Sequence, residues 1–127
     1  MRYLLIISFA VFAGAGCSRT PTLAAQIQSA GGELALKREC QSIFEEHQKT
    51  QKEFFESASP PTIAALKPQI VQVRSYDGLP MVDIQVSGGF SHHGVMVALT
   101  NTPAGFLPRK NSWRVMKIGE GVFEYRE

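Results

Sequence analysis

The fold of this chain is decided by residues 70–86, which read IVQVRSYDGLPMVDIQV. Two runs rich in apolar and β-branched residues, Ile70 to Tyr76 and Met81 to Val86, stand on either side of Asp77-Gly78. An Asp-Gly pair between two such runs is typical of a β-hairpin with a two-residue turn. The sequence therefore predicts two antiparallel strands joined at Asp77-Gly78.

In the second of these strands, apolar and polar side chains alternate between two faces. Successive side chains of a strand point to opposite sides, so Val82, Ile84 and Val86 share one face. Asp83 and Gln85 fall on the other face. We expect the valine and isoleucine face to pack on the core.

More strands follow the hairpin. Val95 to Thr100 is apolar enough on both sides to be a central strand. After a loop at 101–112, two further runs, Trp113 to Ile118 and Val122 to Tyr125, are joined by Gly119-Glu120-Gly121. The pattern predicts four or five antiparallel strands in a meander.

A helical pattern precedes the strands. Leu36, Cys40 and Ile43 recur at helical spacing over residues 33–57, and Glu33 stands four residues before Lys37 as a stabilising pair. The prolines at 60–61 end this pattern and begin a short helical turn at 62–66. We therefore predict one long amphipathic helix over 33–57.

These elements define an α+β fold in a single domain over residues 33–127. We expect the long amphipathic helix to pack on the meander sheet, because neither element can bury its apolar side alone. This arrangement is similar in outline to cystatin-like folds, a likeness of fold that implies no particular function.

The first twenty residues, MRYLLIISFAVFAGAGCSRT, have the layout of an export signal. A single basic residue, Arg2, is followed by an uncharged run from Tyr3 to Ala13 and then by small residues. This order is typical of a secretory signal peptide that is removed from the mature protein. We expect residues 1–16 to be the signal peptide.

The residues at the end of this segment, Gly14-Ala15-Gly16-Cys17, resemble the lipobox of bacterial lipoproteins. The resemblance is confined to this segment and departs from the family's pattern at Gly14, where leucine is usual. It implies that Cys17 is acylated, with chains such as palmitate, and becomes the first residue of the mature protein. Residues 17–32 are then expected to be the lipid attachment point and a flexible tether, with a frayed helix over 18–32 as the alternative.

A second cleavage site competes with the lipobox. Ala13-Gly14-Ala15 is an ordinary small-x-small site that would release a soluble protein starting at Gly16. In that case Cys17 is free to form a disulfide with Cys40 in an oxidising compartment. With an acylated Cys17, Cys40 is expected to be a small buried hydrophobic residue.

The charge balance excludes one class of partner. The formal net charge is +2, and acidic and basic residues are interspersed. Because nucleic-acid binding requires a concentrated positive surface, we expect no nucleic-acid partner. The expected partners are the membrane, through the N-terminal lipid, and a protein of the cell envelope.

The sequence SGGFSHHG, residues 87–94, contains adjacent histidines between two predicted strands. The simplest interpretation is a hairpin connection whose glycines supply unusual backbone angles or a bulge. The alternative is a soluble periplasmic metal-binding or hydrolytic protein that uses His92 and His93 together with Asp83. No recognised metal-ligand spacing and no nucleophile motif accompanies them, so the sequence predicts no catalytic residue, metal or cofactor.

Four other residues are candidates for a partner surface. Phe90 and Phe106 lie in predicted connections, where an exposed aromatic ring would mark a contact surface. Arg109 and Lys110 belong to a group of four positive residues within nine, with Arg114 and Lys117, that are candidates to face anionic headgroups or an acidic partner. The simpler interpretation is a solvated strand and loop, because three glutamates follow closely. The function expected from the whole sequence is a membrane-anchored, non-enzymatic binding or structural module of the bacterial envelope.

Overall fold

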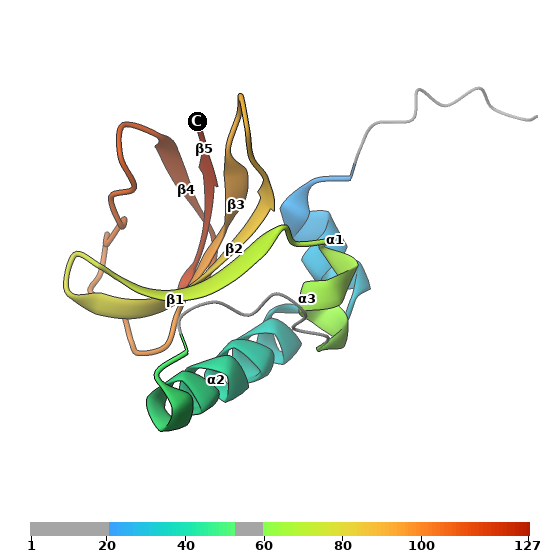
Figure 1. The fold of residues 1–127 in the computed structure, drawn as a ribbon. Helices are drawn as coiled ribbons and strands as arrows, with labels where there is room; N and C mark the ends of the chain where they lie inside the picture. The colour runs from blue at the N-terminus through green and yellow to red at the C-terminus, as the bar shows by residue number, and fades with distance from the viewer. Residues whose placement is uncertain (1–20, 53–59) are drawn as a thin grey trace, which may run out of the picture.

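The computed structural model describes residues 21–52 and 60–127 (Figure 1). Three helices and five strands are formed by these residues. In chain order they are α1 (Leu23–Ser29), α2 (Glu33–Thr50), α3 (Pro61–Ala65), β1 (Ile70–Tyr76), β2 (Leu79–Ser87), β3 (His93–Ala98), β4 (Arg114–Gly119) and β5 (Val122–Arg126).

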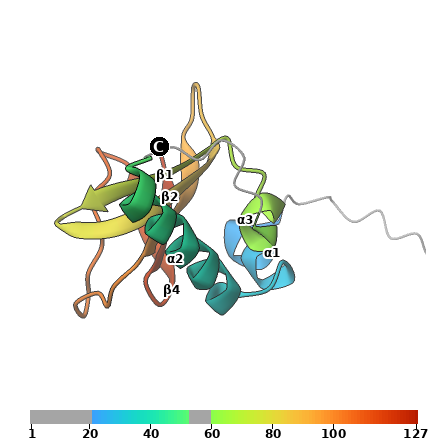
Figure 2. The ribbon, with the colours of Figure 1, turned by 60° about the horizontal axis from the view of Figure 1, so that its bottom comes forward.

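The α+β class predicted from the sequence is confirmed. The five strands form one antiparallel sheet, and the three helices cover one of its faces (Figures 1 and 2). In the described parts of the chain, no helix combines the length and the apolar character needed to cross a membrane.

The predicted hairpin is present with the expected turn. Tyr76 pairs with Leu79 across the turn, and Val73 pairs with Val82 farther along. Asp77 has a φ of 49° and Gly78 a φ of 81°. Two successive residues with positive φ match the right-handed twist of the flanking strands, which is why an Asp-Gly sequence is favoured here.

The predicted meander is wrong for the last two strands. The sheet order is β1-β2-β3-β5-β4, so β5 lies between β3 and β4. In β5, Val122, Phe123 and Tyr125 are at most 2% exposed, whereas the β4 residues Arg114 and Met116 are exposed. The more apolar strand takes the inner position because both of its faces are buried there.

The long helix is shorter than predicted and is one of three helices. α2 ends at Thr50, because Gln51 has a left-handed φ of 58° and caps the helix. The prediction extended to residue 57, and residues 53–59 lie outside the described part of the chain. The predicted turn at 62–66 is confirmed as α3.

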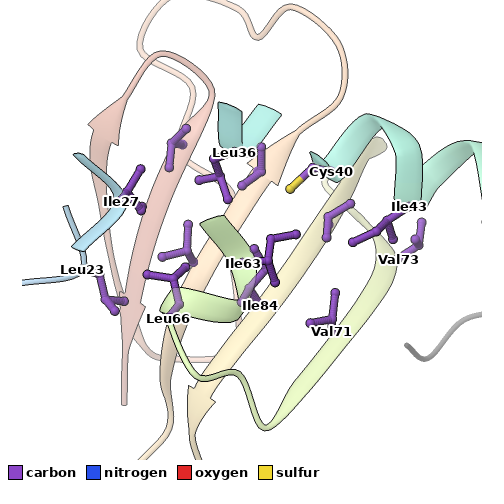
Figure 3. Packing of buried hydrophobic residues seen from close by; sticks show 14 residues of the cluster. Leu23, Ile27, Leu36, Cys40, Ile43, Ile63, Leu66, Val71, Val73 and Ile84 are labelled. Carbon is purple, nitrogen blue, oxygen red and sulfur yellow. The ribbon is translucent and has the colours of Figure 1, made fainter. Parts of the chain in front are cut away.

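Of the two alternatives for this segment, a flexible tether and a frayed helix, Leu23–Ser29 take the helical one and form α1, which is packed on the domain. Thr22 caps this helix: its hydroxyl accepts a hydrogen bond from the Ala25 N–H at 3.1 Å. Leu23 and Ile27, one turn apart, are each only 3% exposed and join the core beneath the helices (Figure 3). Residues 17–20 lie outside the described residues.

The sheet carries a core on each face. The larger core lies under the helices and includes Leu36, Cys40 and Ile43 of α2, as the helical spacing predicted (Figure 3). The smaller core lies on the opposite face, under the loop of residues 99–113. It is formed by Met81, Met96, Ala98, Phe123 and Tyr125, with Phe106 and Trp113 packed against it.

Candidate functional site

A charged cluster is buried in the smaller core. Asp83 of β2 is fully buried, and its two carboxylate oxygens accept hydrogen bonds from different elements. Oδ1 accepts one from the Tyr125 hydroxyl at 2.7 Å. Oδ2 accepts one from the Tyr76 hydroxyl at 2.5 Å, one from the Lys110 ammonium and a longer one from the Gln72 amide.

Lys110 reaches this carboxylate from the loop that covers the sheet. Its Nζ donates a hydrogen bond to the Tyr76 hydroxyl at 2.9 Å. The ammonium also lies 4.5 Å from the centroid of the Tyr125 ring, 5.2 Å from that of Tyr76 and 5.4 Å from that of Trp113. These distances are within the range of cation–π attraction.

The cluster holds the loop of residues 99–113 on the sheet. A buried ion pair is costly to desolvate, and that cost is offset only when further hydrogen bonds and good geometry accompany the pair. Here the Asp83 carboxylate and the Lys110 ammonium have both, through Tyr76 and Tyr125. We call the side chains of Asp83, Lys110, Tyr76 and Tyr125 the latch, because their contacts hold the loop on the sheet. This arrangement is typical of a structural contact rather than of a reactive site.

Gly94 makes room for this latch. A Cβ atom built at Gly94 would lie 2.4 Å from the Tyr125 hydroxyl oxygen and 2.4 Å from the Ile84 carbonyl oxygen. Gly94 is also the cross-strand partner of Tyr125. The glycine therefore lets the tyrosine ring lie flat across β3 and reach Asp83.

The electrostatics of the cluster keep both tyrosines protonated. Burial raises the pKa of Tyr125 and of Tyr76 far above the ordinary tyrosine value, and the adjacent Asp83 charge raises both further. Neither phenol is suited to act as a base near neutral pH.

Two predicted site residues are thus corrected. Lys110 was expected on a partner surface but is only 9% exposed, because it pairs with Asp83. Asp83 was the candidate partner of the histidines in the alternative interpretation, but its carboxylate contacts Tyr76, Lys110 and Tyr125 instead. A signal for this existed in the sequence: an aspartate within the apolar run from Met81 to Val86 must find a partner when it is buried.

His92 lies on the same side of the sheet as the latch, at its margin. Its ring stacks on Trp113 with 4.8 Å between centroids, and Trp113 stacks in turn on Tyr125. The His92 Nδ1 lies 2.5 Å from a carboxylate oxygen of Glu127, whose pKa is lowered by this hydrogen bond. His92 therefore joins the end of β5 to the hairpin loop.

His93 makes contacts on the other side. Its Nε2 lies 3.1 Å from an oxygen of Glu124, which also accepts a hydrogen bond from Arg126 Nε at 2.8 Å. Glu124 is cross-strand partner to Val95, a residue of the core under the helices. The two neighbouring histidines therefore make contacts on opposite faces of the sheet; His93 is the first residue of β3, and His92 immediately precedes it.

The structure does not bring His92, His93 and Asp83 together. Among residues 21–52 and 60–127, no group of three or more histidine, cysteine, aspartate or glutamate side chains is placed to hold a metal ion. The hairpin interpretation of residues 87–94 fits the geometry: Gly89 has a φ of 88°, and the pairing of β2 with β3 shifts register between Gln85 and Ser87.

The remaining candidates for a partner surface divide into exposed and packed residues. Phe90, at the tip of the β2–β3 hairpin, is 107% exposed. Phe106 is only partly exposed and meets Phe123 edge to face, so the condition that both phenylalanines be exposed is not met. Arg109 is exposed, and its backbone N–H donates to a carboxylate oxygen of Asp77 at 3.0 Å.

A hollow of about 210 Å³ lies between α2 and the ends of β3 and β5. None of the residues predicted from the sequence as candidates for a site lines it. Its lining includes Lys37, Gln41, Asn101 and Glu120.

Comparisons of this chain with protein-family models, with curated proteins and with solved structures give no match. Its function is therefore inferred from its own residues.

Proposed function

We propose that this chain is an exported bacterial envelope protein, anchored to a membrane by acylation of Cys17, whose domain is a non-enzymatic binding or structural module. The observation that carries the proposal is the order of the first seventeen residues: a basic start, an apolar run and the lipobox-like GAGC. Several acyl chains on one cysteine would make release from the membrane very slow, because each buried methylene contributes about 0.8 kcal/mol.

The non-enzymatic part of the proposal is supported by the use of the charged groups. The buried carboxylate of Asp83 is fully engaged by two hydroxyls and an ammonium. His92 and His93 each pair with a glutamate on a different side of the sheet. Each of these contacts joins two different elements of the fold, which supports a structural role for the side chains involved.

The test is the intact mass and the location of the chain made in a bacterial host. We expect a membrane fraction that contains a chain beginning at Cys17 with added lipid mass, labelled by palmitate. The Cys17→Ser variant should lose both the label and the membrane location. An unacylated wild-type chain in the soluble fraction, beginning at Gly16, would overturn the proposal.

The soluble metal-binding or hydrolytic alternative has its own test. If it holds, zinc or copper should raise the melting temperature of the domain, and replacing His92 and His93 with alanine should abolish that gain. We expect neither ion to change the melting temperature, because the two rings do not converge on one point.

A further inference from the structure

If Cys17 carries the lipid, the position of α1 determines which end of the domain lies near the membrane. α1 is packed into the core from Leu23 onward, and its cap is Thr22. Only four peptide steps separate Cys17 from Pro21, so the connection spans at most about 14 Å when fully extended. The lipid and the start of α1 are therefore close together, and the end of the domain that bears this start must be close to the bilayer.

That end is the one from which the β2–β3 hairpin projects (Figure 1). Ala24, Ile27 and Gln28 of α1 line a small hollow with Gly119 and Val122, near the turn between β4 and β5. The carboxylate of Glu33, which follows α1 in sequence, lies beside Gly119, so the C-terminal end of α1 is the end nearer this turn. α1 consequently begins toward the opposite end of β5, where Arg126 pairs with His93 at the base of the hairpin. We call this the hairpin end; it comprises Lys67, residues 87–93, Arg114 and Arg126.

The hairpin end has the side chains of an interfacial surface. Phe90 is completely exposed at the hairpin tip, flanked by small residues. Behind it, His93, Arg126 and Arg114 are cross-strand partners in one row across β3, β5 and β4. Like charges placed directly opposite one another are unfavourable in a sheet unless an anion lies near them.

Two carboxylates partly offset this row. Glu124 is only 4% exposed and accepts the hydrogen bond from Arg126, and Glu127 pairs with His92. Lys67 and Arg114 are exposed at the same end. The remaining positive charge is small, so it would orient the domain on an anionic surface without holding it there alone.

We propose that the hairpin end lies against an anionic phospholipid surface, with the Phe90 ring in the headgroup region and the Arg114 and Arg126 side chains at lipid phosphates. This inference rests on the proposed lipid anchor. The short connection from Cys17 to Pro21 keeps this end of the domain close to the bilayer, and the Phe90 ring provides an apolar contact with it. The arginine row favours the orientation in which Arg114 and Arg126 face the lipid phosphates.

The test imposes the anchor chemically, so that it does not depend on acylation in a cell. The chain from Cys17 onward, which contains every described core residue, is coupled through Cys17 to a maleimide lipid in vesicles of phosphatidylcholine and phosphatidylglycerol. Cys40 should not compete for the maleimide, because it is fully buried and burial raises its pKa. Tryptophan is then placed at the hairpin tip by Phe90→Trp, and bromine-labelled lipids quench tryptophan near the bilayer.

The matched control is Leu34→Trp. Leu34 is also an exposed apolar residue, at 75%, but it lies at the start of α2. The neighbouring Glu33 is close to Gly119, so this control sits at the opposite end of the domain from the hairpin. The signal of Trp113, present in both variants, is subtracted with the unsubstituted chain.

We expect a blue shift and a loss of emission for Trp at position 90 and neither change for Trp at position 34. Arg114→Glu, added to Phe90→Trp, should reduce the quenching on vesicles with phosphatidylglycerol, and about 1 M salt should remove the difference by shortening the Debye length to about 3 Å. Equal quenching at positions 90 and 34 would overturn the inference. The proposed function would stand in that case, because it is tested separately by the mass of the chain made in the host.

Discussion

At the scale of single residues, the stability of this domain depends on a buried charge pair. Asp83 and Lys110 come from a strand and a loop 27 residues apart in sequence. Their side chains have almost no contact with solvent, at 0% and 9% exposure. Removing one member of such a pair leaves the other charge buried without its counter-ion.

Lys110→Met should therefore lower the free energy of unfolding by about 3–5 kcal/mol. The combined variant Lys110→Met with Asp83→Asn should recover part of that loss, because it leaves no unpaired charge. Urea denaturation followed by circular dichroism measures both, independently of Trp113. A loss below about 1 kcal/mol, the range of exposed pairs, would show that the pair is solvated.

Gly94→Ala should destabilise the domain by about 1–3 kcal/mol, the usual range for added atoms in a packed core. The new methyl group would collide with the Tyr125 hydroxyl and the Ile84 carbonyl. The Tyr125 ring carbon Cζ would also lie only 2.6 Å from the added methyl, so a Tyr125→Phe background would keep a clash. In a Tyr125→Leu background, which lacks the phenol ring, the cost should be smaller, since only the clash with the Ile84 carbonyl is certain to remain. Equal costs in both backgrounds, from the same denaturation measurement, would mean that the tyrosine does not lie across Gly94.

Tyr76 and Tyr125 are the two tyrosines of a chain that begins at Cys17, so they can be titrated by absorbance alone. Burial raises both pKa values. A raised folded-state pKa gives stability that is complete below the unfolded value of about 10 and is lost as the pH rises through the folded value. Tyrosinate absorbance should thus appear together with the loss of the circular dichroism signal. Tyrosinate that forms at about pH 10 in a folded domain would contradict this.

At the scale of elements, the hairpin and α2 could be predicted from the local sequence, whereas the packing of α1 could not. The hairpin at Asp77-Gly78 and the apolar stripe of α2 were predictable, because local chemistry determines each of them. The packing of α1 into the core was not predicted, because its two buried residues, Leu23 and Ile27, are surrounded by small and polar ones that resemble a linker. Its burial depends on contacts with α2 and α3.

Two other errors have the same cause. β5 takes the place between β3 and β4 because it is more apolar than β4. The pattern within each strand predicts that a strand forms, but it does not predict the order of the strands in the sheet. Lys110, in a loop next to Arg109, looked solvated, since nothing nearby in sequence suggests Asp83 as its partner.

Ile27→Ala should lower the free energy of unfolding by about 2–4 kcal/mol, because it removes buried methylenes from the core under the helices. Gln28→Ala, at an exposed position of the same helix, should change it by less than about 0.5 kcal/mol. Both are measured by urea denaturation. If the two substitutions have equal effects, α1 is a tether after all.

At the scale of the whole molecule, the core under the helices protects its cysteine. Cys40 is fully buried, and burial raises the pKa of its thiol, with the nearby Glu39 adding to the effect. In a Cys17→Ser chain, a thiol reagent should label Cys40 only as fast as the domain unfolds, and urea should accelerate the labelling. Rapid labelling of the folded chain would revive the Cys17–Cys40 disulfide as an alternative.

The inner position of β5 has a consequence for how the protein is made. β5 follows β4 in sequence, yet it lies between β3 and β4 and joins β4 to the rest of the sheet. Until residues 122–126 have been synthesised, β3 has one open edge and β4 has no neighbour. A chain exported during synthesis would therefore cross the membrane before its sheet could close, and folding would be completed only on the far side.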